Sequence, residues 1–192
     1  MVRSLGDVRT IPGDDCQSCG ARVTVCESAR LRLRQLSCSD APFVLELLND
    51  PAFLVNVGDR GVRTLEDARR YLETGALASY ACHGFGMWLT ELKSPAAPIG
   101  LCGLLRRDWH PDVEIGFALL PRFRRHGYAL EAARATLWLA THSLGLKRVV
   151  ALTAPDNAGS IRILASLGLK FERLARFGEH GEQSRLFVLE MP

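Results

Sequence analysis

The segment 113–144 changes abruptly from one local pattern to another. Residues 113–120 form a short apolar run that predicts a buried strand, whereas residues 128–144 carry apolar side chains at helical spacing and stop at Gly145. The helical stripe consists of Leu130, Ala133, Leu137, Ala140 and Leu144. A single turn, residues 121–127, joins the two. A strand followed so directly by a long helix favours an α/β fold in which the helix packs on the sheet.

The turn between this strand and helix is basic and contains one glycine, Gly127, after Arg122, Arg124 and Arg125. Free N–H groups at a helix start, together with the helix dipole, favour an anion there. Gly127 lets the backbone approach a phosphate, and the small Ala129 keeps side-chain bulk away. Neither the nucleotide P-loop pattern nor the dinucleotide fingerprint is present. These residues alone are equally compatible with a tight turn on a basic surface.

The rest of the chain predicts a mixed sheet with helices packed on it. In order, the patterns indicate a strand at 31–34, a helix from Asp40 to 48, a helix from Thr64 to Gly75, strands at 85–92, 99–105, 113–120 and 148–153, a helix at 157–167, and a hairpin of 171–177 and 182–190. The three central strands are expected to form an antiparallel meander. Residues 1–26 show no period and are interpreted as a flexible or loosely packed extension, with one domain over 27–192.

Composition excludes several classes of function. A net charge of +3 is too small to argue for a nucleic-acid or membrane surface. No apolar run approaches about 18 residues, and no signal peptide is apparent, so the expected location is the cytoplasm. The six cysteines suggest no disulfide framework, and the lone Cys16-Gln17-Ser18-Cys19 lacks the second pair of a zinc ribbon. We therefore expect no metal.

Four motifs in order resemble those of the GNAT superfamily of acetyl-CoA-dependent N-acetyltransferases. They are Arg124-x-x-Gly127-x-Ala129, which matches the pyrophosphate loop [RQ]-x-x-G-x-[GA]; Val113-Glu114-Ile115-Gly116-Phe117 before it; Glu131-Ala132 after it; and Asn157-Ala158-Gly159-Ser160-Ile161 with Leu167-Gly168-Leu169. Each motif is weak alone, but the ordered set is specific. It resembles the branch of ribosomal-protein N-terminal acetyltransferases (RimJ/RimL type), over residues 27–190.

The resemblance implies both a fold and a cofactor site. The fold would be a mostly antiparallel sheet with one splayed strand pair, flanked by about four helices. Acetyl-CoA would be the acyl donor, with its pantetheine arm in the gap between the splayed strands. The residues that would hold it are Phe117, Ala118 and Leu119 along the strand, the backbone of Arg124, Arg125, His126, Gly127, Tyr128 and Ala129 at the pyrophosphate, and Asn157 and Ser160. Asn157 would also serve as a plain helix cap.

The resemblance also suggests how an amine would be acylated. Glu114, on a buried strand beside the cleft, is the candidate base, acting directly or through water; its alternative role is an ion pair with a nearby arginine. His110 and His126 are weaker alternatives. Ser160 is the candidate group that protonates or orients the leaving thiolate. Many relatives carry a tyrosine seven residues after the asparagine, where this chain has Leu164, so positioning contributes much of the acceleration.

The acceptor amine is less constrained than the cofactor. The branch favours a protein N-terminal amine, with a small-molecule amine such as an antibiotic or polyamine as the same-class alternative. The acceptor site is expected around residues 53–63, with Trp109 at its rim. Asp59, Arg60 and Arg63 in that connection form a mixed set that selects no substrate. A non-catalytic acyl-CoA-binding or regulatory module on the same fold is the alternative from another class. The sequence is compatible with a monomer or a homodimer.

Overall fold

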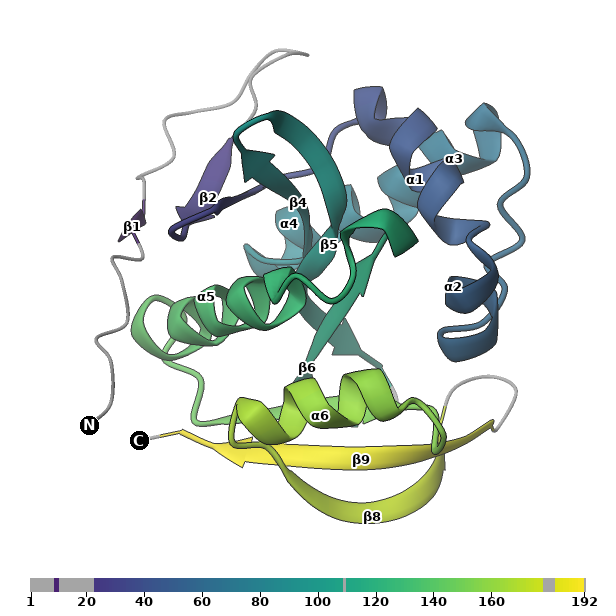
Figure 1. Ribbon diagram of the computed structural model, residues 1–192. Coiled ribbons are helices and arrows are strands. Elements are labelled where there is room, and N and C mark those ends of the chain that lie inside the picture. Colours follow the sequence, from purple (N-terminus) through teal and green to yellow (C-terminus); the bar gives the residue numbers. More distant parts are fainter. Residues whose placement is uncertain (1–8, 11–22, 109, 178–181, 192) are drawn as a thin grey trace.

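One sheet of nine strands organises the computed structural model, which describes residues 9–10, 23–108, 110–177 and 182–191 (Figure 1). The strands lie in the order β1-β2-β3-β4-β5-β6-β7-β9-β8, and all neighbours are antiparallel except β6 and β7. Their bounds are β1 Arg9–Thr10, β2 Thr24–Glu27, β3 Leu31–Arg34, β4 Met87–Lys93, β5 Ala96–Arg107, β6 His110–Leu119, β7 Arg148–Thr153, β8 Lys170–Phe177 and β9 Glu182–Glu190. The predicted meander, β4–β5–β6, and the closing hairpin are confirmed.

Helices cover both faces of the sheet (Figure 1). They are α1 Ala41–Leu48, α2 Pro51–Asn56, α3 Leu65–Leu72, α4 Ala78–His83, α5 Tyr128–His142 and α6 Ala158–Ser166, with short helical turns η1 Cys38–Asp40, η2 Glu73–Leu77 and η3 Pro121–Phe123. Ala133, Leu137 and Ala140 of the predicted α5 stripe pack with Leu164 of α6 and the sheet in one core cluster. Leu144 lies beyond the end of α5 and is exposed. α1 and α3 bury Leu47 and Leu72 against the opposite face in a second cluster. None of these helices is long and apolar enough to cross a membrane.

β6 and β7 diverge, as expected of the splayed pair. Their parallel register contains only Val113↔Val149 and Glu114↔Val150, although β6 continues to Leu119 and β7 to Thr153. Figure 1 shows β6 running away from the layer that α6, β9 and β8 form. The mostly antiparallel mixed α/β fold with one splayed pair is therefore confirmed, and the gap opens just beyond Glu114.

One predicted helix boundary and one expected side-chain cap are wrong. Gly75 does not end the second helix, because α3 continues through η2 into α4 and the run ends at Gly84, which takes the left-handed conformation (φ 74°). A glycine inside a helix costs only about 1 kcal/mol relative to alanine, which the packing of α3 can offset. Asp40 precedes α1, but its side chain does not cap that helix; it pairs with Arg34 at 2.7 Å. The predicted helix start at Thr64 is confirmed, and Thr64 and Asp67 form a capping box there.

The N-terminal part of the chain adds two strands to the predicted set. β1 pairs with β2, and β2, at Thr24–Glu27, pairs with β3, so the sheet already includes residues of the segment 1–26. Cys16 and Cys19, Trp109 and most of that segment lie outside the described residues.

Candidate functional site

The loop between β6 and α5 has the backbone of an anion site. After η3, Arg125 and Gly127 both take left-handed conformations, with φ of 64° and 79°. Gly127 is the N-cap residue of α5 and has no side chain, so the N-cap position offers no acceptor to the first N–H groups of the helix. Arg125, His126 and Gly127 are exposed. The loop therefore presents the positive end of α5, with an arginine beside it, at the surface.

Arg30, which the sequence analysis missed, holds this loop from the other side. It lies just before β3, and its guanidinium bonds Glu131 at 2.7 Å, donates to the His126 carbonyl at 3.1 Å and lies 4.6 Å over the Tyr128 ring. Glu131 also accepts from the Ser28 hydroxyl at 2.7 Å. Burial raises the pKa of Glu131, but these donors outweigh it and hold the pKa below its ordinary value. No local pattern marks this contact, since Arg30 and Glu131 are 101 positions apart.

Arg124, the first residue of the loop motif, points into the protein. Its Nε donates to the Leu119 carbonyl at 2.9 Å, and its Nη2 bonds Asp50 Oδ1 at 2.5 Å. Its backbone N–H donates to the Pro121 carbonyl at 3.1 Å. The predicted phosphate contact of Arg124 therefore competes with internal partners, whereas the Arg125 side chain is exposed.

The predicted pantetheine residues lie on the free edge of β6. Phe117, Ala118 and Leu119 pair with β5 through one edge. Beyond Glu114 no strand of the described chain pairs with their other edge. Backbone N–H and C=O groups on that edge face the gap between β6 and β7, where an extended ligand could bond to them.

Glu114 lies where the gap begins, and both roles considered for it have support. It is 8% exposed, and Arg107 Nε donates to its carboxylate at 3.1 Å. Burial raises the pKa of Glu114, against the opposing effect of Arg107, Arg60 and His110. By strand alternation it faces the same side as Ala118, toward the cluster that α1 and α3 cover. The carboxylate is thus both paired and shifted toward the protonated form.

The start of α6 contains the remaining predicted residues. Asn157 accepts from the Ser160 N–H at 3.0 Å, which confirms it as the helix cap. Ser160 is half-buried, and Leu164 is 1% exposed in the core and has no proton to donate. Thr153, at the end of β7, is a polar residue that the sequence analysis missed: its hydroxyl is buried with no hydrogen-bond partner among the described residues.

Comparison with known proteins gives the family. The model of the Acetyltransferase (GNAT) domain matches residues 30–170. The chain is 27% identical over 154 residues to the uncharacterized N-acetyltransferase YoaA of Bacillus subtilis, covering 79% of this chain and 86% of YoaA. A GNAT-family acetyltransferase from Bacillus anthracis superposes with a TM-score of 0.72 at 24% identity, covering 85% of this chain and 96% of that one. RimL, the ribosomal L7/L12 α-N-protein acetyltransferase, in complex with coenzyme A, shares the fold with a TM-score of 0.73 at 17% identity over the same shares. The chain belongs to the GNAT family of acetyltransferases.

Proposed function

We propose that this acetyltransferase transfers an acetyl group from acetyl-CoA to an amine by direct attack of the amine on the thioester. The observation that carries the proposal is the position of buried Glu114 at the point where β6 and β7 part. In this arrangement the unpaired edge of β6 would bind an extended acyl donor, and the start of α5 would bind its phosphates. The carboxylate beside them would then act as the base.

The chain's residues fit coenzyme A. The first N–H groups of α5, left without a side-chain cap, would bind the pyrophosphate, and exposed Arg125 would add charge. The free edge of β6 at Phe117, Ala118 and Leu119 would bond the pantetheine arm. Asn157 would contact the arm with its amide nitrogen, since its oxygen caps α6. The bound cofactor supplies the activated acyl thioester.

Glu114 would remove the proton that the acceptor ammonium must lose. Its burial favours the protonated carboxyl, so it can hold a proton at a higher pH than an exposed glutamate. Arg107 limits that shift and orients the carboxylate. As the amine nitrogen bonds to the acyl carbon and the carbon–sulfur bond breaks, a β6 backbone N–H would stabilise charge on the acyl oxygen. Ser160 would orient the leaving thiolate, which would take up the proton that the amine nitrogen loses as it becomes an amide.

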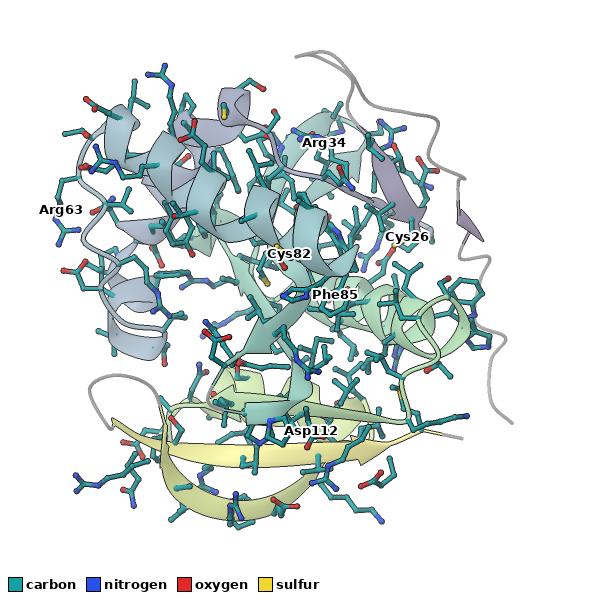
Figure 2. All side chains as sticks on the ribbon, turned by 180° about the vertical axis from the view of Figure 1, so that it is seen from behind. Cys26, Arg34, Arg63, Cys82, Phe85 and Asp112 are labelled. Carbon is teal, nitrogen blue, oxygen red and sulfur yellow. The ribbon has the colours of Figure 1, made fainter. Side chains whose placement is uncertain are left out.

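For the acceptor, we favour a protein N-terminal amine. Polycationic acceptors such as aminoglycosides or polyamines call for a concentration of unpaired acidic groups. In the connection after α2, Asp59 instead forms an ion pair with Arg63, which lies at the outer edge of the molecule (Figure 2). The exposed side chains of Val55 and Val57 make the neighbouring surface of α2 apolar, which suits a peptide better than a polyamine.

Calorimetry with coenzyme A and acetyl-CoA, followed by a thiol-release assay, tests the proposal. The amine panel contains peptides with free N-termini, the same peptides blocked at the N-terminus, spermidine and an aminoglycoside. We expect turnover with free N-termini and none with blocked ones. Tight binding of acetyl-CoA without turnover on any amine would indicate the binding module instead. A protein that binds no coenzyme A would refute both.

A further inference from the structure

Asp50 is a buried carboxylate where α1 passes into α2. Its side chain is only 7% exposed. Its Oδ1 accepts from the Phe53 N–H at 3.2 Å, which caps α2, and from Arg124 Nη2 at 2.5 Å. Arg124 also donates to the last carbonyl of β6, at Leu119. One guanidinium therefore joins the start of α2, the end of β6 and the loop that leads into α5.

α2 has few other anchors. Phe53 is its one buried side chain, and Val55 is 81% exposed. A six-residue helix is too short to be stable on its own, so its order depends on the contacts that it makes. The Asp50–Arg124 pair is the polar contact that ties this helix to the cofactor loop.

A shift of Arg124 away from Asp50 is unfavourable. It would leave a buried carboxylate without its counter-ion, which is among the costliest changes in a protein interior. The side chain of Arg124 is therefore fixed by the protein, while neighbouring Arg125 stays exposed. The two arginines of the motif therefore differ in their partners. Arg125 and the first amides of α5 are open to a ligand, whereas Arg124 bonds Asp50 at the start of α2, near the expected acceptor site.

We infer that the Asp50–Arg124 pair positions α2 and transmits ordering of the cofactor loop to it. This rests on the proposed function, because it requires coenzyme A at the start of α5. When the loop is held by the pyrophosphate, the fixed guanidinium holds Asp50, and the capped end of α2 becomes ordered with it. Arg124 and Asp50 are accordingly positioning residues for the acceptor side, beyond the phosphate contact that the loop motif suggests.

A neighbouring ion pair provides the control. Arg122, two residues earlier in the chain, bonds Glu46 of α1 at 2.5 Å, but these side chains are 56% and 49% exposed. An exposed pair contributes little because water screens it. Glu46→Gln therefore removes an ion pair between α1 and the same loop without disturbing the pair at buried Asp50.

Hydrogen exchange of the full chain, with and without coenzyme A, tests the inference without knowledge of the acceptor. In the wild type we expect coenzyme A to slow exchange in both the loop and α2, by about tenfold or more. In Asp50→Ser the hydroxyl still caps Phe53 N–H but is uncharged and too short to hold Arg124. Coenzyme A should then protect the loop but no longer α2, with its Kd changed by no more than about threefold. Glu46→Gln should behave like the wild type.

Several outcomes overturn the inference. If coenzyme A binds and α2 stays unprotected in the wild type, or stays protected in Asp50→Ser, the pair transmits nothing. If Arg124→Gln weakens coenzyme A binding and flattens its salt dependence while α2 remains protected, Arg124 is a phosphate ligand instead. A wild type that fails to bind coenzyme A refutes the proposed function as well, which separates the two failures. Asp50→Asn, which keeps size and cap, replaces Asp50→Ser if the latter does not fold.

Discussion

Replacement of Arg30 should weaken the binding of coenzyme A while sparing donors that lack its ADP portion. Arg30→Met keeps the apolar stem and removes the guanidinium that contacts Glu131, His126 and Tyr128. Those contacts hold the His126 carbonyl turned toward Arg30 and fix the loop in which Gly127 is left-handed. Without them, ordering of the loop must be supplied by the ligand, which lowers its affinity.

The structure bounds the size of the effect. Arg30 is half-exposed, so its ion pair with Glu131 contributes at most about 1 kcal/mol. The hydrogen bond to the His126 carbonyl adds about 1 kcal/mol, and the contact with the Tyr128 ring adds about 0.5–1 kcal/mol. Together these contributions reach about 2.5–3 kcal/mol, which is an upper limit because part of it also stabilises the fold of the free protein. If about half of this free energy is lost from coenzyme A binding, the Kd increases roughly tenfold.

The assay compares two acyl donors. With acetyl-CoA, the KM of Arg30→Met should rise about tenfold, whereas with S-acetylpantetheine, which has no pyrophosphate, the kinetics should stay close to wild type. Arg32→Met is the matched control: Arg32 lies two residues away, is similarly exposed and pairs with Glu27 instead. Equal losses with both donors would mean that Arg30 supports the fold generally. Unchanged KM for acetyl-CoA would mean that the loop needs no support from this side.

Three further changes test the catalytic and structural groups. Glu114→Gln should lower kcat more than it weakens acetyl-CoA binding, and an unchanged kcat at saturating amine would exclude Glu114 as the base. The kcat of the wild type should fall as the pH drops through the raised pKa of Glu114. Ser160→Ala should lower kcat and leave Kd for coenzyme A unaltered, because the helix cap uses the Ser160 N–H rather than its hydroxyl. Asp40→Asn should destabilise the protein by about 2–4 kcal/mol in urea unfolding, since Arg34 keeps only Glu91 as a carboxylate partner. Burial raises the pKa of Asp40, but the ion pair with Arg34 outweighs burial and holds the pKa below its ordinary value. The stabilisation from this pair is therefore present above the unfolded-state pKa of about 3.9 and is lost as the pH falls below it. The difference in stability between Asp40→Asn and the wild type should shrink over the same pH range.

Features set by neighbouring residues could be predicted from the sequence. The helix start at Thr64 and the Asn157 cap each depend on a few adjacent residues, and each is found. The strand β7 and the meander follow from apolar runs bounded by turns. Gly75 shows the limit of such reasoning, because the packing of α3 carries the helix through a residue that often ends one.

Contacts between distant segments could not be predicted. Arg30 meets Glu131 across 101 positions, and Arg124 meets Asp50 across 74. Many arginines in this chain have the same local surroundings, and nothing in the sequence states which of them meets a buried carboxylate. For Glu114, the fold shows the ion pair with Arg107, and burial raises the pKa of the same carboxyl group. The ion pair therefore leaves the base role open as a proposal.

The position of Glu114 follows from an ion-pair cluster at the start of β6 and β7. Arg148, at the start of β7, bonds Asp112 of β6 at 2.9 Å and Glu172 of β8 at 3.0 Å, and Asp112 lies beside the β8–β9 layer (Figure 2). This cluster holds β6 and β7 together where they begin, so they can part only toward their carboxyl ends. Glu114 is the last β6 residue that pairs with β7. It is therefore enclosed where the two strands are joined, and it borders the gap where they part. That combination gives a carboxylate whose pKa is raised by burial and which borders the gap where we propose that the acyl donor binds.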